Sequence, residues 1–128
     1  MSYNLFLDDV REPNTFLQSI KTWVIARDYN AFINIITEKG MPMFISFDHD
    51  LAFEHYPFND DRQDGTRIPY NEYSEKTGYH CALWLTEHCM NMNFPLPEFQ
   101  VHSMNPVGKQ NINSLLKRFK EIQKSNQI

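Results

Sequence analysis

The chain has 128 residues, of which 41% are hydrophobic and 22% charged, and its formal net charge is −4 at pH 7. One domain fits this length and the apolar residues suffice for a core, which excludes a second domain and a wholly disordered chain. Apolar runs such as 44–47 and 81–85 are far shorter than the roughly 20 residues of a membrane-spanning helix, and no basic stretch precedes an apolar one near residue 1. We therefore expect a single domain over residues 1–128, without a membrane partner, in the cytoplasm of a cell or of an infected host.

Short apolar runs that stop at polar residues recur along the chain and predict strands. These runs cover residues 5–7, 23–26, 43–47 and 99–101. Each is followed at once by a polar cluster: Asp8-Asp9, Arg27-Asp28, Asp48-His49-Asp50 and His102-Ser103-Met104-Asn105. Four strands are therefore expected, and no run predicts a fifth.

Helical signals fill the segments between the predicted strands. Asp28 is a candidate N-cap for a helix that ends at Lys39-Gly40, and Thr77-Gly78 opens a second helix. Apolar residues at 112, 115, 116, 119 and 122 give the last segment one apolar face, which is typical of an amphipathic helix. Strands that alternate with helices predict an α/β fold, a three-layer sandwich in which a parallel sheet of about four strands has helices on both faces.

Residues 52–76 break this pattern. Pro57, Gly65 and Pro69 are scattered there among polar and aromatic residues. A segment of this length without predicted structure is uncommon in a compact domain, and such segments are often binding loops. We interpret residues 52–76 as a long insertion, or lid, after the third strand.

The polar clusters at the four strand ends are the candidates for a functional site. In an open parallel sheet, ligands bind beyond the carboxyl ends of the strands, where these clusters would meet. Aspartates in such places also make turns and helix caps, which is the structural alternative. Crowding argues against that alternative as the whole explanation, because adjacent carboxylates repel one another unless a cation, an arginine or a proton lies between them.

Two histidines directly follow predicted strands and suggest acid–base chemistry. His49 and His102 could lie across a phosphodiester, one taking a proton from the nucleophile and the other giving one to the leaving oxygen. An aspartate could orient either imidazole. The predicted catalytic residues are His49, His102, Asp48 and Asp50.

Cation and phosphate binding are predicted from the same strand ends. Mg²⁺ favours one or two carboxylates together with water and phosphate, and it is the one candidate cofactor. The predicted cation ligands are Asp8, Asp9 and Asp48. Guanidinium groups, backbone N–H groups at a helix start and side-chain donors can all bind phosphate. The predicted substrate-binding residues are Arg11, Arg27, Ser103, Asn105, Gly108 and Asn111.

Four segments of the chain resemble the cyclic-phosphate-processing receiver family, a divergent form of the response-regulator receiver domain that is found in bacteria and phages. The segments are residues 5–13, 45–51, 78–85 and 101–108, with Asn111, and the resemblance covers nearly the whole chain. It implies a flavodoxin-like sheet of order 2-1-3-4. It also matches the family's acidic pair to Asp8 and Asp9, the receiver acceptor region to 48–50, and the distinguishing histidine motif to His102, Ser103 and Asn105.

The resemblance implies processing of cyclic nucleotides or of cyclic-phosphate RNA ends. The leading hypothesis is a phosphoesterase that opens a cyclic phosphodiester. The alternative is a non-catalytic receiver-like module that binds a nucleotide or a protein partner. A third hypothesis is an acyl-phosphate switch on Asp48, but the Thr or Ser and the Lys-Pro that an ordinary receiver uses have no counterpart here. The oligomeric state is not predicted.

Overall fold

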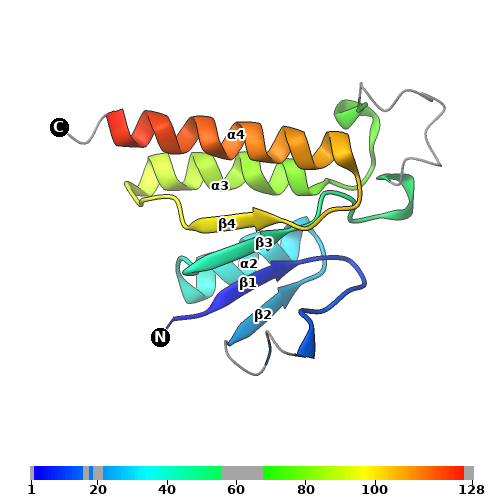
Figure 1. The fold of residues 1–128 in the computed structure, drawn as a ribbon, viewed down its shortest axis with the longest axis horizontal. Helices are drawn as coiled ribbons and strands as arrows, with labels where there is room; N and C mark the ends of the chain where they lie inside the picture. Colours follow the sequence, from blue (N-terminus) through cyan, green and yellow to red (C-terminus); the bar gives the residue numbers. More distant parts are fainter. Residues whose placement is uncertain (1, 16–17, 19–21, 56–67, 126–128) are drawn as a thin grey trace.

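The structure, a computed structural model, describes residues 2–15, 18, 22–55 and 68–125. A parallel sheet of four strands in the order β2-β1-β3-β4 forms its centre (Figure 1). The strands are β1 (Asn4–Leu7), β2 (Trp23–Ala26), β3 (Phe44–Phe47) and β4 (Glu98–Val101). The predicted strands and the predicted order 2-1-3-4 are confirmed, with strand limits within one residue of those expected.

The strand register aligns the carboxyl ends of all four strands. Leu7 of β1 lies opposite Ala26 of β2 and Phe47 of β3, and Phe47 lies opposite Val101 of β4. Because the strands are parallel, the residues that follow these positions begin their loops at one edge of the sheet, toward the right in Figure 1. The predicted polar clusters therefore meet at that edge.

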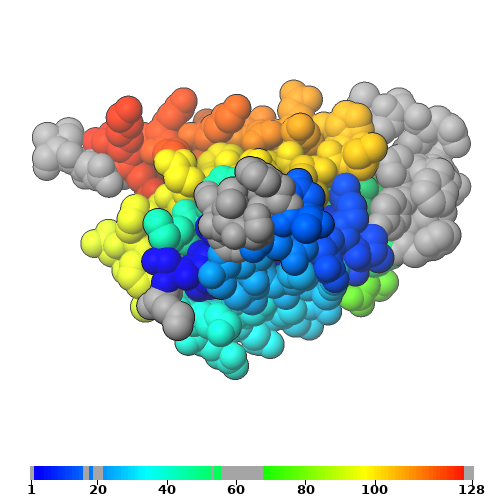
Figure 2. All heavy atoms as spheres, turned by 60° about the horizontal axis from the view of Figure 1, so that its bottom comes forward, coloured from blue at the N-terminus to red at the C-terminus, as the bar shows by residue number. Residues whose placement is uncertain are grey.

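Three described helices begin at side-chain caps. The helices are α2 (Tyr29–Lys39), α3 (Gly78–Met92) and α4 (Pro106–Ser125). Asp28 accepts the Ala31 N–H at 2.8 Å and starts α2, while Gly40, at φ 87°, ends it as predicted. Thr77 and His80 form a capping box at the start of α3. In Figure 2, α4 (orange to red) runs along the upper edge of the molecule.

The core lies between one face of the sheet and these helices. Its strand side chains are Leu5, Leu7, Ala26, Ile45, Phe47 and Val101. Its helix side chains include Phe32, Ile36, Cys81, Leu85, Ile112 and Leu116. Since side chains alternate along a strand, Phe6 and Ser46 point to the opposite face. The predicted three-layer sandwich requires helices on that face as well; between β1 and β2, residues 16–17 and 19–21 lie outside the described residues.

The predicted insertion is held to the domain at both ends. Its described parts contain the short 3-10 helices η1 (Phe53–His55) and η3 (Tyr70–Glu72), whereas residues 56–67 lie outside the described part of the chain. The buried His55 ring accepts the Leu51 N–H at 2.9 Å and donates to the Glu75 carbonyl at 2.7 Å. One histidine thus ties the two ends of the insertion together.

No described helix combines the length and the apolar character needed to cross a bilayer. Cys81 and Cys89 are both buried free thiols.

Candidate active site

Asp8 anchors the loop after β1. Its side chain is fully buried, and Oδ1 accepts the N–H groups of Val10 at 3.0 Å and Arg11 at 2.8 Å. Oδ2 accepts from Nε of Arg11 at 2.8 Å and lies 2.9 Å from Nε2 of His102. Burial alone would raise the pKa of Asp8, but these hydrogen bonds and the Arg11 charge outweigh burial and lower the pKa below its usual value. Asp8 is therefore an ionised carboxylate whose hydrogen bonds all come from N–H groups.

Asp48, at the end of β3, is less well compensated. Its Oδ1 accepts the N–H of His49 at 2.8 Å, while its Oδ2 lies 3.6 Å from the Arg11 guanidinium. Burial, followed by the negative charge of Asp8, raises the pKa of Asp48 to about 6. Both carboxylates contact Arg11, and the contact of Asp48 is the longer of the two.

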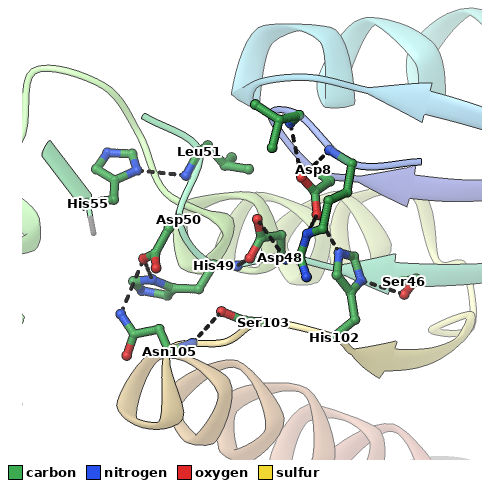
Figure 3. A network of polar contacts seen from close by, with 12 residues as sticks. Asp8, Ser46, Asp48, His49, Asp50, Leu51, His55, His102, Ser103 and Asn105 are labelled. Atoms are coloured by element: carbon green, nitrogen blue, oxygen red, sulfur yellow. Dashed lines mark hydrogen bonds and ion pairs between the residues drawn. The ribbon is translucent and has the colours of Figure 1, made fainter. Parts of the chain in front are cut away.

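His102 completes the group from the end of β4. Its ring stacks on Phe6, with centroids 4.5 Å apart and planes 5° apart. Nδ1 lies 2.7 Å from Oγ of Ser46, and Nε2 faces Asp8 (Figure 3). The side chain is 17% exposed, so the ring is in part accessible to solvent.

Asp8, Asp48 and His102 together could hold a metal ion. One ligand atom from each lies within 4.8 Å of the other two. Two of the three predicted cation ligands, Asp8 and Asp48, are in this group. Asp9 is half-buried, and the cluster found among the described residues has His102 in its place.

His49 does not face the same space as His102. Its fully buried ring lies 2.7 Å through Nδ1 from Oδ1 of Asp50 and 2.8 Å through Nε2 from the Tyr70 hydroxyl. In Figure 3 the His49 and His102 rings lie on opposite sides of Asp48. Both ring nitrogens of His49 are thus engaged within the protein, and the two imidazoles are not arranged across a common cavity.

The predicted substrate-binding residues of the β4–α4 segment form hydrogen bonds within the protein. Oδ1 of Asn105 accepts the Gly108 N–H at 3.0 Å, and its Nδ2 donates to Asp50 at 3.2 Å. Oγ of Ser103 accepts the Asn105 N–H at 3.1 Å. Asn111 donates to the Tyr70 hydroxyl at 3.0 Å. These contacts cap α4 and join it to the β3 loop and the insertion.

Gly108 serves close packing. A Cβ at this position would lie 2.3 Å from Cγ of His49, far inside van der Waals contact. The absence of a side chain at Gly108 therefore lets α4 approach His49. Because Asn105 already accepts its N–H, Gly108 adds no free donor at the start of the helix.

The two predicted arginines have different surroundings. Arg27 donates to the Arg11 carbonyl at 2.8 Å and lies 3.4 Å from Glu12, so it braces the loop after β1. Arg11 contacts both carboxylates of the site, and its side chain is 43% exposed. Of the two guanidinium groups, that of Arg11 is at the site.

Sequence reasoning missed Ser46, Tyr70 and Gln100. Ser46 is the one polar residue in the apolar run 43–47, and this interruption was a usable signal. Tyr70 reaches His49 from the insertion, and no local pattern marks that contact.

The parallel sheet of order 2-1-3-4, with acidic residues at its carboxyl edge, is consistent with a receiver-like α/β domain. The sequence profile of the cyclic-phosphate processing receiver domain matches residues 3–118, and the chain belongs to this family. No curated protein and no solved structure matches the chain significantly.

Proposed function

We propose that this chain is a phosphodiesterase that opens cyclic phosphates, either cyclic nucleotides or 2',3'-cyclic phosphate ends of RNA. The observation that supports this best is the group formed by Asp8, Asp48 and His102, with ligand atoms within 4.8 Å of one another beside the half-exposed Arg11. The family description points to the same substrate class.

The donor set fits a hard divalent cation such as Mg²⁺. Such an ion takes one or two carboxylates and fills its other positions with water and phosphate oxygens. Asp8 and Asp48 would hold it, since the raised pKa of Asp48 reflects a buried negative charge that Arg11 compensates only in part. When bound, the ion would polarise the phosphate and lower the pKa of a bound water.

The chain's own groups account for the remaining steps. Hydrolysis joins the water oxygen to phosphorus and breaks one ring P–O bond, whose oxygen leaves as an alkoxide that needs a proton. Arg11 would bind the non-bridging phosphate oxygens, a task suited to its forked guanidinium. In its imidazolium form, His102 would give its Nε2 proton to the leaving oxygen and keep the proton on Nδ1, which leaves a neutral ring. In the cation-free site, Asp48 is the available base for the proton of the attacking water.

The other predicted site residues have supporting roles in this proposal. His49 and Asp50 fix the loop that carries Asp48, and Tyr70 locks that loop to the insertion. Arg27 holds the loop that carries Asp8 and Arg11. The residues that cap and join α4 are Ser103, Asn105, Gly108 and Asn111.

A substrate panel followed by phosphorus NMR tests the proposal. It contains 2',3'-cyclic and 3',5'-cyclic mononucleotides, cyclic dinucleotides and RNA with a cyclic-phosphate end, each with Mg²⁺ and with excess EDTA. Conversion of at least one member to a phosphomonoester or an opened diester is expected. Full conversion in EDTA would remove the cation from the mechanism and leave Asp48 as the base.

Absence of turnover would have a defined meaning. If no member of the panel is converted and calorimetry still detects binding of one of them, the non-catalytic receiver-like module replaces the phosphodiesterase.

A further inference from the structure

A chain of hydrogen bonds runs along the sheet face opposite the described helices and ends at the site. Nε2 of Gln100 on β4 donates to Oγ of Ser46 on β3 at 2.9 Å. The same Oγ lies 2.7 Å from Nδ1 of His102, and Nε2 of His102 lies 2.9 Å from Oδ2 of Asp8. The Ser46 side chain is fully buried, although its strand is otherwise apolar.

The hydrogen-bonding groups of Asp8 and Ser46 determine which nitrogen of the His102 ring carries the proton. The Asp8 carboxylate accepts from two backbone N–H groups and from Arg11, and it has no proton to give, so Nε2 of His102 must carry the proton between them. In the neutral ring Nδ1 then holds a lone pair and needs a donor. Ser46 is the donor beside it, and its Oγ is in turn free to accept from Gln100.

We propose that Ser46 is a positioning residue whose hydroxyl donates to Nδ1 of His102 and keeps the proton of the neutral ring on Nε2, so that the ring presents an N–H at the site and leaves cation binding to Asp8 and Asp48. A ligating imidazole nitrogen must offer its lone pair to the ion. Nε2 is protonated in this arrangement, and Nδ1 is turned to a fully buried serine. Any use of this N–H in turnover rests on the proposed phosphodiesterase function, whereas the tautomer and the cation ligands do not.

Two features of the fold support a dedicated position for the ring. Phe6 stacks on one face of the imidazole and fixes its plane. A buried hydroxyl within a strand is costly unless its hydrogen bonds are made, and Ser46 makes two. The serine therefore has a use at this position that an apolar residue could not fulfil.

Nuclear magnetic resonance of protein labelled with nitrogen-15 histidine tests the tautomer without any substrate or cation. Long-range proton–nitrogen correlations show which ring nitrogen is protonated, and the variant His102→Gln assigns the signals. The neutral His102 ring is expected to carry its proton on Nε2. In Ser46→Ala the Nδ1 signal should move toward that of a lone pair without a donor, and in Ser46→Thr it should stay in place. The ring of His88, stacked on Trp84, is the internal control.

Calorimetric titration with Mg²⁺ and Mn²⁺ tests the ligands. His102→Gln is expected to change cation affinity less than about threefold, whereas Asp48→Asn should weaken it more than tenfold. A proton on Nδ1, an unmoved signal in Ser46→Ala, or equal loss of affinity in the two variants would overturn the inference. If the wild-type protein binds neither cation, the ring spectrum decides alone. Failure of turnover on every cyclic phosphate would instead count against the proposed function.

Discussion

Asp8 and Asp48 lie side by side at adjacent strand ends, yet their pKa values are shifted in opposite directions. Asp8 has the closer contact with Arg11, 2.8 Å against 3.6 Å, and it also accepts from His102. Asp48 is left as a buried charge next to another of the same sign. Because of this asymmetry, the charge of Asp48 lowers the stability of the folded protein more than that of Asp8. Destabilising charges of this kind are common at functional sites.

Asp48→Asn should therefore stabilise the cation-free protein. The folded-state pKa of Asp48 is raised to about 6, so its destabilising effect is fully present above that pH and disappears as the pH falls to the ordinary aspartate value near 4. Urea denaturation should show a gain of up to about 3 kcal/mol near pH 8, shrinking between about pH 6 and 4. A loss of stability near pH 8 would show that the Asp48 charge is compensated after all.

Stability should also depend on the charge of His80. Its Nδ1 accepts the Thr77 N–H at 2.9 Å in the capping box, and burial together with the charge of Lys76 lowers its pKa to about 4. As the pH falls, His80 is protonated in the unfolded chain before it is protonated in the folded protein. The free energy of unfolding is therefore at its full value above about pH 6.5 and decreases as the pH drops toward 4. The expected loss is on the order of 1–3 kcal/mol.

His80→Gln is the matched control for that dependence. Glutamine at this position can keep the capping box without titrating. The difference in unfolding free energy between wild type and variant should change across this pH range, and parallel curves would show that His80 does not contribute.

His49 and His102 should respond differently to substitution by glutamine. His49→Gln removes a buried ring that contacts both Asp50 and Tyr70, and it should cost about 2–4 kcal/mol of stability. His102→Gln should leave the fold largely intact and lower kcat by roughly 100-fold or more. Both are measured by urea denaturation and by turnover of the best cyclic phosphate. A stable His49→Gln protein without turnover would restore the mechanism with two imidazoles.

Gly108→Ala tests whether this glycine serves packing. The added methyl group would lie 2.3 Å from His49, so either α4 or His49 must move, at a cost of about 1–3 kcal/mol. Gly40→Ala is the comparison, because it introduces backbone strain at φ 87° in open space. If Gly108→Ala kept full stability and lost only affinity for phosphate, Gly108 would be an anion-binding residue as the sequence first suggested.

Strand limits and helix caps could be predicted because each rests on a local signal. Apolar runs stop at charge, Asp28 and Thr77 precede helical periodicity, and Gly40 follows it. The family resemblance supplied the order of the strands, which no local signal contains.

The make-up of the site was only partly predictable. Positions 8, 48 and 102 each follow a core-facing strand residue, and these three strand residues are aligned in the sheet. Their side chains are therefore expected on the sheet face opposite the core, whereas the side chain at position 49 is expected on the core side. Counting that alternation would have separated His49 from His102. The contact of Tyr70 with His49 depends on how the insertion folds back, and the sequence carries no periodic signal for it.

The most direct test of the central claim is phosphorus NMR of a nucleoside 2',3'-cyclic phosphate incubated with wild type, His102→Gln and the control His88→Gln in Mg²⁺ buffer. Wild type and His88→Gln are expected to convert the cyclic ester to an acyclic monoester, and His102→Gln to leave it unchanged over the same time. Equal conversion by all three proteins would contradict the assignment of His102 as the proton donor. No conversion by wild type, here and across the full panel of cyclic phosphates, would contradict the phosphodiesterase itself.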